Sequence, residues 1–123
     1  MILLDTNIVI AYFEGDDRIN TWLSLQRTRD EMLCISIVSV TELLSFPDST
    51  DEQLQLIERW IKTSIWILPI DERIAIHAGE LCRKSRLKTA DALIAATATQ
   101  NRAALATRDK DFKKLKDLNL IDL

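Results

Sequence analysis

Short apolar runs alternate along the whole chain with segments whose apolar residues recur at helical spacing. A continuous apolar run such as 32–35 is typical of a strand covered on both faces. The segments between the runs, such as 54–61, carry an apolar stripe and are typical of amphipathic helices. Strands are expected at 2–4, 32–35, 65–68, 103–107 and 118–121.

This alternation predicts an α/β fold, because parallel strands need helical crossovers between them. We expect a three-layer α/β/α sandwich around a central, mostly parallel five-stranded sheet. No repeat or change in composition marks a boundary, so residues 1–123 are expected to form one domain. The first apolar run is too short for a signal peptide and no later run approaches membrane-spanning length, so we expect a cytoplasmic protein without membrane contact.

Three helix starts are indicated by their polar residues. Ser39 and Glu42 have the S-x-x-E spacing of a capping box, which predicts a helix that opens at Ser39. Thr50 and Gln53 stand in the same relation and predict a second capped helix. Asp71 is the expected cap of the helix that follows the third strand.

The segment 90–98 is almost wholly apolar and rich in alanine, apart from one carboxylate at Asp91. Alanine and leucine favour helix, and a helix that is apolar on all sides belongs inside a domain. Thr89 is the expected N-cap, and an acid in the first turn is stabilised by the exposed backbone N–H groups. This local stabilisation is enough to explain a lone aspartate at the start of a helix. A catalytic role for Asp91 therefore requires other acids at the same point.

Four acids far apart in the sequence are expected to meet at one edge of the sheet, where open parallel sheets bind ligands beyond the carboxyl ends of their strands. Asp5 follows the first strand directly, and Glu42 falls in the first turn of the helix after the second strand. A helix that leads into a parallel strand runs antiparallel to the sheet. The helix that carries Asp91 therefore begins at this edge. The fourth strand runs back to the same edge, so Asp109, which follows it, is expected there too.

A cluster of carboxylates suits a hard cation, because clustered acids raise each other's pKa unless a cation compensates their charge. Oxygen ligands favour Mg²⁺ or Mn²⁺. The two cysteines form no CxxC pair and His77 is the only histidine, so no zinc site is expected. A divalent ion held by acids favours hydrolysis of a phosphodiester bond, because the ion polarises a phosphate oxygen and lowers the pKa of a water.

The formal net charge of −3 argues against a protein that coats nucleic acid through an overall positive field. Basic residues nevertheless flank the acids. Arg86 and Lys88 precede Asp91, and Lys110 follows Asp109. These side chains are candidates for phosphate contacts on either side of a scissile bond, and a plain solvated surface is the alternative.

Four motifs run through the chain in order: L-L-D-T-N at 3–7, T-E-L at 41–43, A-D-A-L-I-A-A-T-A at 90–98 and T-R-D-x-D-F at 107–112. In order and spacing the chain resembles PIN-domain ribonucleases, specifically the VapC-like toxins of type II toxin–antitoxin systems. The resemblance implies an RNA endonuclease that is often a homodimer and is kept silent by a cognate antitoxin. It implies catalytic and metal-binding roles for Asp5, Glu42, Asp91 and Asp109, with Thr6 and Thr107 as assisting hydroxyl groups at the substrate.

Asp111 is a secondary candidate for the fourth acid, and its alternative role is the N-cap of a short helix beginning at Phe112. Other protein classes also place acids at strand ends. A receiver-type phospho-acceptor domain needs an acidic pair where only Asp5 stands, and a haloacid-dehalogenase-type phosphatase needs D-x-D where the chain has D-T-N. A PIN-like module that binds RNA or protein without catalysis is the remaining alternative.

The apolar stripes of two helices exceed what one small sheet needs. We expect this surface to form a homodimer and to leave a helical groove for a segment of the antitoxin, from which a basic residue could reach the acids. The residues concerned are Trp22, Leu54, Trp60 and Ile61.

Overall fold

The computed structural model describes all 123 residues and contains a five-stranded sheet in which every neighbouring pair is parallel. The strand order is β3-β2-β1-β4-β5, which places β1 at the centre. The predicted α/β fold with a five-stranded sheet is confirmed, and the sheet is wholly parallel. The strands are β1 (Ile2–Leu4), β2 (Leu33–Ser36), β3 (Trp66–Leu68), β4 (Ala104–Thr107) and β5 (Leu120–Asp122).

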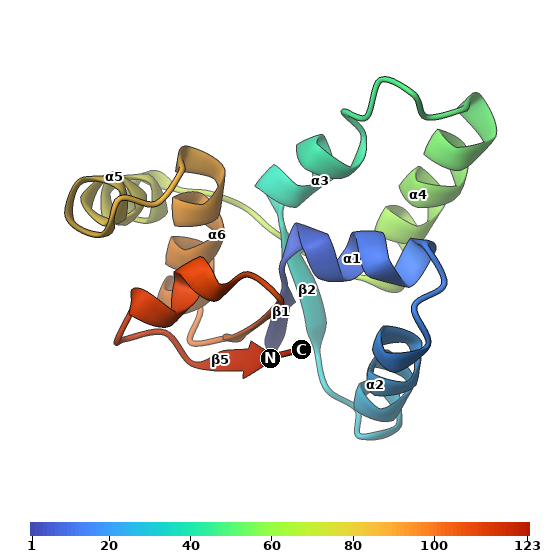
Figure 1. The fold of residues 1–123 in the computed structure, drawn as a ribbon, viewed down its shortest axis with the longest axis horizontal. Helices are drawn as coiled ribbons and strands as arrows, with labels where there is room; N and C mark the ends of the chain where they lie inside the picture. The colour runs from blue at the N-terminus through green and yellow to red at the C-terminus, as the bar shows by residue number, and fades with distance from the viewer.

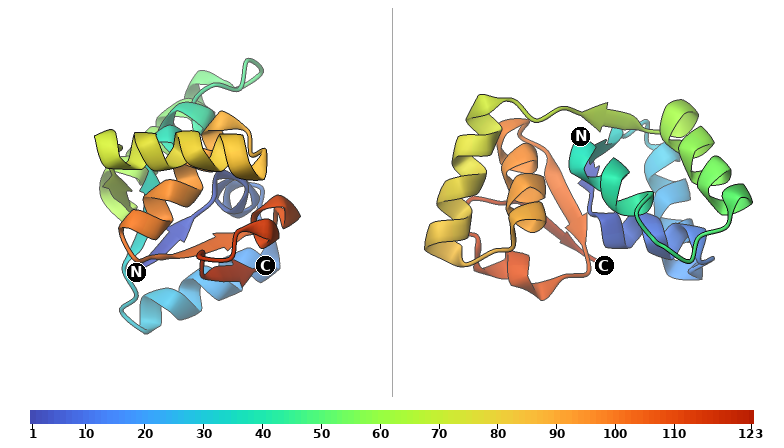
Figure 2. Two further views of the ribbon diagram at one scale, coloured as in Figure 1. Left: turned by 90° about the vertical axis from the view of Figure 1, so that its left-hand side faces the viewer. Right: turned by 90° about the horizontal axis from the view of Figure 1, so that it is seen from above.

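Helices cover both faces of the sheet, as Figure 1 and the two turned views of Figure 2 show. The helices α1, α2 and α4 pack on one face, and α5, α6 and the 3₁₀ helix η1 lie on the other. The short helix α3 lies at the carboxyl edge and contributes side chains to both cores. The bounds are α1 Thr6–Phe13, α2 Asp17–Thr28, α3 Ile37–Leu43, α4 Asp51–Ser64, α5 Glu72–Ser85, α6 Thr89–Gln100 and η1 Lys110–Lys114.

The alternation of side chains along β1 divides the interior into two cores. Leu3 packs with the alanine-rich face of α6, whereas Leu4 packs on the opposite face with Ile8 of α1 and Leu23 of α2. Leu3 and Leu4 are both fully buried. Each such burial stabilises the fold by about 1.5–3 kcal/mol, so the central strand is fixed from both sides.

The strand order reverses between β1 and β4, because successive strands run β1, β2, β3 to one side and β4, β5 to the other. Such a switch point leaves a crevice at the carboxyl ends of the strands. Asp5 is the first residue after β1, and its N–H donates to the Ala106 carbonyl of β4 at 2.9 Å. Asp5 therefore lies at the switch point itself.

At this edge the chain enters a helix directly after β1 and directly after β2. Asp5 is the N-cap of α1, which begins at Thr6, and the predicted start of α3 at Ser39 is wrong. The N-cap of α3 is Ser36 rather than Ser39, so Ser39 and Glu42 form no capping box and Glu42 lies in the last turn. Ser36 ends the buried strand β2, and the chain turns into the helix at that point, three residues before the predicted start.

Two further caps differ from the predictions. Lys88, in extended conformation, is the N-cap of α6, and Thr89 is already the first helical residue. Asp109 rather than Asp111 caps η1, with its carboxylate accepting the N–H of Asp111 at 2.9 Å. With this cap the helix begins at Lys110, two residues before the expected start at Phe112, and it ends at Lys114.

Two other predicted caps are confirmed. Thr50 and Gln53 form a complete capping box at the start of α4, with hydrogen bonds of 2.9 and 3.2 Å. Asp71 accepts the N–H of Ile74 at 2.9 Å and caps α5.

No helix in the structure is both long and apolar enough to cross a bilayer.

The apolar surface differs from the one that the sequence suggested. Trp60 and Ile61 are buried within the chain's own core, where Trp60 packs against Tyr12 and Phe13. Exposed apolar residues lie on several elements, and among them is Trp66 of the edge strand β3, which is 65% exposed. A free edge strand with an exposed tryptophan is a feature of surfaces that pair with another chain.

Candidate active site

Asp5 lies at the bottom of the crevice and is held by both of its carboxylate oxygens. Its Oδ1 accepts the N–H of Thr6 at 2.8 Å, and its Oδ2 accepts the Thr107 hydroxyl at 2.6 Å. The side chain is almost fully buried, with 4% of the residue exposed. A buried carboxylate that accepts two hydrogen bonds has a fixed orientation, so Asp5 is a preorganised acceptor of positive charge.

Thr107 connects Asp5 to the fourth acid. Its hydroxyl donates to Asp5, and the same oxygen accepts the backbone N–H of Asp109 at 2.9 Å. Asp109 then caps η1 through its Oδ1. One hydroxyl at the end of β4 thus sets the position of two carboxylates that are separated by more than a hundred residues.

Thr6 plays the corresponding part for Glu42. Its Oγ1 lies 2.7 Å from Glu42 Oε1 and 2.9 Å from the Ser39 hydroxyl. A hydroxyl has one proton, so when Thr6 donates to the carboxylate, the Ser39 hydroxyl supplies its own proton to Thr6. Ser39 is fully buried, and it acts on Glu42 through Thr6 rather than as a helix cap.

Asp91 lies in the first turn of α6, where the backbone N–H groups stabilise negative charge. Its residue is partly buried, and burial is the main cause that raises the pKa of its carboxyl above the ordinary value. The charges of Asp109 and Glu42 raise this pKa further, while the Lys88 ammonium lowers it. These effects place Asp109, Glu42 and Lys88 within electrostatic reach of Asp91.

The pKa of Asp5 is raised from 3.8 to about 6, chiefly because the carboxyl is buried. Its hydrogen bonds with Thr107 and Thr6 lower the pKa, and the charges of Asp91 and Glu42 raise it. The net increase means that ionised Asp5 lacks a compensating charge. Such a group gains stability from a bound cation.

One pocket of about 440 Å³ brings the four acids together. It opens at the carboxyl edge of the sheet and has only two apolar residues in its wall, so it suits a charged ligand in water. The lining residues are Asp5, Thr6, Asn7, Ile10, Glu42, Ser45, Phe46, Asp91 and Asp109.

The donor set fits a hydrated hard cation. No three acidic, histidine or cysteine side chains are arranged to hold one ion directly. Mg²⁺ keeps several of its waters and leans on one or two carboxylates, so it does not need a closed cage of protein ligands. Four carboxylates around an open polar pocket supply the oxygen chemistry that this ion prefers.

Besides the buried Thr107, four predicted residues lie outside the pocket wall, and all four are exposed: Arg86, Lys88, Lys110 and Asp111. Asp111 is exposed and contributes its backbone N–H to Asp109. Arg86 is the left-handed C-cap of α5, with φ of 55°, and Lys88 is the N-cap of α6. Both basic side chains are exposed at the turn that leads to Asp91, and neither is in an ion pair.

Ser39 and Asn7 are among the residues of the site that were not predicted from the sequence. Ser39 was assigned to a capping box, although its spacing from Glu42 equally fits two side chains on one helix face. Asn7 lines the pocket, and its Oδ1 is 3.5 Å from the backbone N of Arg108. Its position directly after Asp5 and Thr6 was the available signal.

The chain is similar to known proteins in sequence and in structure. Ribonuclease VapC10 of Mycobacterium tuberculosis is 34% identical over 113 residues, which cover 87% of this chain and 81% of that protein. A chain in a toxin-antitoxin complex from Klebsiella pneumoniae is 29% identical, has a TM-score of 0.83, and is matched over 98% of this chain and 96% of that one.

A third comparison bears on the fold alone. A chain in the crystal structure of VapBC2 from Rickettsia felis, bound to a DNA fragment from its promoter, has a TM-score of 0.85 at 24% identity. The match covers 100% of this chain and 99% of that one.

The sequence model of the PIN domain matches residues 2–118. With a match over almost its full length, this chain belongs to the PIN domain family.

Proposed function

We propose that this protein is a divalent-metal-dependent endoribonuclease that hydrolyses RNA phosphodiester bonds, and that it is the toxin of a toxin–antitoxin pair. The observation that carries the proposal is the meeting of Asp5, Glu42, Asp91 and Asp109 in one polar pocket at the switch point of the sheet. Family membership and the ribonuclease among the related proteins support RNA as the substrate.

The four acids would hold Mg²⁺ or Mn²⁺. When bound, such an ion supplies an acidified water and neutralises the charge that develops on the phosphate. The chain's own contribution is orientation. Thr107 fixes Asp5 and the backbone of Asp109, and Thr6 fixes one oxygen of Glu42, whose Oε2 accepts no hydrogen bond from the protein and is free to bind water.

This function is tested by mapping where cellular RNA is cut. Expression of the protein without a partner is expected to slow growth and to create discrete new 5′ ends, which sequencing of RNA 5′ ends detects. The Asp109→Asn variant, expressed at the same level, is expected to create none. Harmless expression of the unaltered protein with no new 5′ ends would reject the toxin and ribonuclease assignments together.

Glu42 allows chemistry to be separated from folding. Glu42→Gln retains an oxygen for the Thr6 hydroxyl but removes a charge from the pocket. We expect its melting temperature to stay unchanged and its cleavage rate to fall by about 10–100-fold, as for groups that surround a metal site. Glu52→Gln on the exposed start of α4 is the control. Normal cleavage by Glu42→Gln would leave a site of three aspartates.

Arg86 and Lys88 are proposed to bind phosphates next to the scissile bond. The double variant Arg86→Ala/Lys88→Ala is expected to bind single-stranded RNA more weakly. Its plot of log K against log salt should lose about 0.7 of slope for each lost contact, about 1.4 in total. Lys62→Ala on α4, where Lys62 pairs with Glu58, serves as the control. An unchanged slope would make the two residues ordinary solvated surface.

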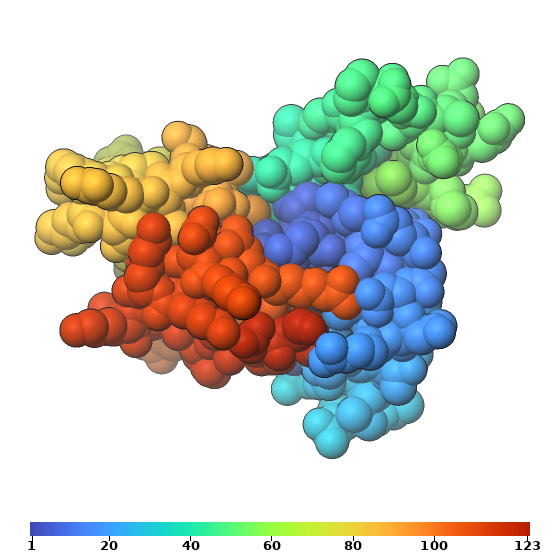
Figure 3. Space-filling view, in the orientation of Figure 1, coloured from blue at the N-terminus to red at the C-terminus, as the bar shows by residue number.

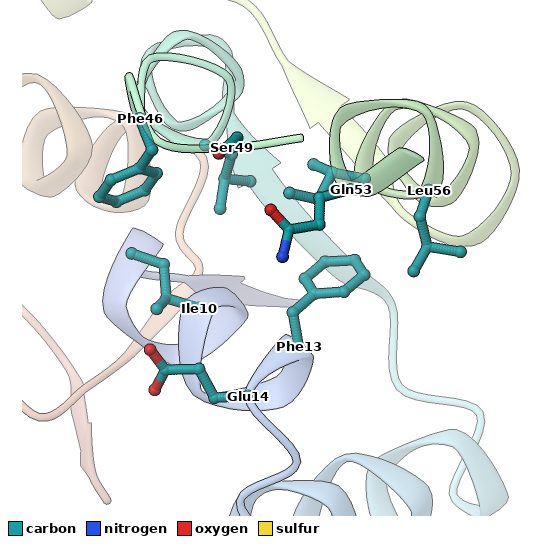
Figure 4. Close-up of a pocket in the computed structure, with 9 residues that line it drawn as sticks. Ile10, Phe13, Glu14, Phe46, Ser49, Gln53 and Leu56 are labelled. Carbon is teal, nitrogen blue, oxygen red and sulfur yellow. The ribbon is translucent and has the colours of Figure 1, made fainter. Parts of the chain in front are cut away.

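An apolar groove beside the pocket is proposed to receive a segment of the antitoxin. Figure 4 shows that side chains from α1, the α3–α4 connection and α4 point into this groove, whose volume is about 300 Å³. Ile10 and Phe46 line both the groove and the acid pocket. A peptide whose apolar side chains fill the groove could therefore place a basic side chain among the acids and block the site.

A homodimer is proposed to form through the exposed edge of β3 rather than through the buried Trp60 and Ile61. Trp66 and Ile67 are exposed on this strand. Light scattering of the purified protein is expected to give the mass of a dimer, and Trp66→Glu to shift it towards the monomer because a buried charge has no partner there. Leu56→Glu is the control, because Leu56 is also exposed but lies on α4 rather than on β3. A monomer at all concentrations would contradict the proposal.

A further inference from the structure

Arg108 lies between Thr107 and Asp109, yet its guanidinium contacts a different part of the fold. Its Nη2 lies 2.7 Å from Asp16 Oδ2, in the connection between α1 and α2. The space-filling view shows orange atoms of the β4–η1 region meeting blue atoms of the α1–α2 region across the front of the molecule (Figure 3). This ion pair joins the connection that carries the fourth acid to the opposite layer.

Asp16 is a fixed anchor for this contact. It is the N-cap of α2, and its Oδ1 accepts the N–H of Ile19 at 3.1 Å. Its backbone N–H donates to the Ala11 carbonyl at 3.0 Å. Gly15 precedes it with φ of 79°, a left-handed conformation that glycine adopts without strain. These contacts therefore orient the Asp16 carboxylate independently of Arg108.

The other contacts of the β4–η1 connection lie on either side of Arg108. The Asp109 N–H donates to the Thr107 hydroxyl oxygen at 2.9 Å, and the Asp109 carboxylate accepts the Asp111 N–H at 2.9 Å. Thr107 is held by its hydroxyl and by the Leu123 N–H, which donates to its carbonyl at 3.0 Å. The backbone N–H of Arg108 reaches Asn7 Oδ1 only at 3.5 Å, the long limit of a hydrogen bond. The ion pair with Asp16 is thus the strongest contact of residue 108 and lies one residue before Asp109.

From this geometry we propose that Arg108 is a positioning residue, which holds Asp109 in the acid pocket by pairing with Asp16. The proposal rests on the proposed function. Partly exposed ion pairs contribute little to stability, so the contact matters through geometry rather than through folding energy. Misplacing a reacting group by about 1 Å can lower a rate about a hundredfold.

Two single variants and their combination test this role. Arg108→Ala removes the guanidinium, and Asp16→Asn removes the charge but keeps a side chain that caps helices equally well. We expect each variant to lower kcat by about tenfold with little change in KM, and the double variant to match either single variant, because all three lose one contact. Arg108→Lys should recover part of kcat, since it restores a charge opposite Asp16.

A second readout needs neither metal nor RNA. The N–H of Asp111 donates to Asp109 Oδ1, so its hydrogen exchange, measured by NMR, reports where the Asp109 carboxylate lies. Exchange of this amide is expected to be faster to a similar degree in Arg108→Ala and Asp16→Asn. Glu80→Gln breaks a comparable ion pair of 2.8 Å on α5 and is the control, with unchanged exchange and kcat.

The competing role for Arg108 is a direct contact to RNA. In that case Arg108→Ala would raise KM, Asp16→Asn would leave kcat unchanged, and exchange of the Asp111 amide would not change; this result overturns the proposal. Additive effects of the two variants on kcat would also overturn it. Should the unaltered protein fail to cleave RNA, the proposed function falls, and the exchange experiment alone still decides whether Arg108 positions Asp109.

Discussion

Asp91→Asn is expected to reduce RNA cleavage by more than about a hundredfold while the protein stays folded. The substitution changes one oxygen to nitrogen and leaves the volume of the side chain almost unaltered. Partners outside the direct ligand shell already cost about 10–100-fold when removed, so the loss of a carboxylate in the pocket should exceed that range. Cleavage rates on a single-stranded RNA, with melting curves alongside, measure both quantities.

Folding should hardly suffer from this change. Removing the charge gives up an interaction with the start of α6 that is worth about 0.3–1 kcal/mol. It also removes the unfavourable effect of holding a partly buried negative charge near other carboxylates, which is what raises the pKa of Asp91. Asp111→Asn is the matched control, because Asp111 is an exposed acid outside the pocket wall. If both variants cleave equally, Asp91 is only a helix-start residue.

The second large effect concerns Asp5 and couples stability, pH and metal. The folded protein holds a proton on Asp5 more tightly than the unfolded chain, since its pKa is about 6 rather than 3.8. Its contribution to stability is therefore complete below pH 3.8 and lost as the pH rises through 6. At about 1.4 kcal/mol for each tenfold change in proton affinity, ionised Asp5 destabilises the metal-free protein by about 3 kcal/mol at pH 8.

Asp5→Asn removes this titration and keeps an oxygen that can cap α1. Without metal, the variant is expected to melt several degrees above the unaltered protein at pH 8 and to lose that advantage at pH 4. Mg²⁺ at about 100 times its Kd should stabilise the unaltered protein by about 2.7 kcal/mol at pH 8, less at pH 5 where protons compete, and the variant hardly at all. Melting curves at three pH values, with Mg²⁺ or chelator, measure these shifts.

An equal response of the two proteins to Mg²⁺ would show that the ion does not bind beside Asp5. A variant that melts below the unaltered protein at pH 8 without metal would show that the Thr107 hydrogen bond outweighs the cost of burying the charge. The first outcome contradicts the metal site, and the second contradicts only the electrostatic account of Asp5.

Much of the fold could be predicted from the sequence, because the spacing of apolar residues indicates the strands and helices and the ends of the strands indicate the site. The buried run in β2 and the alanine-rich α6 have environments that their compositions require. The switch point then follows from a general property of parallel sheets. Asp5 and Asp109 could be placed because Asp5 directly follows β1 and Asp109 lies two residues after β4.

The helix starts near the site could not be placed because local signals compete. Ser36 and Ser39 are both good caps three residues apart, and only the packed end of β2 decides between them. The same error gave Glu42 the first turn of α3. It reaches the pocket from the last turn instead, since α3 is short and lies beside the start of α1. The apolar groove depends on three elements that meet only in the folded chain.

The central claim is that the four acids hold a divalent ion that cleaves RNA. Its most direct test is the cleavage of one end-labelled single-stranded RNA by purified protein in excess chelator, with Mg²⁺ or Mn²⁺ then added back in steps. We expect no internal cleavage in chelator and a rate that rises and saturates with either ion, with no such rise in Asp91→Asn. Full cleavage in excess chelator, or equal cleavage by Asp91→Asn, would contradict the claim.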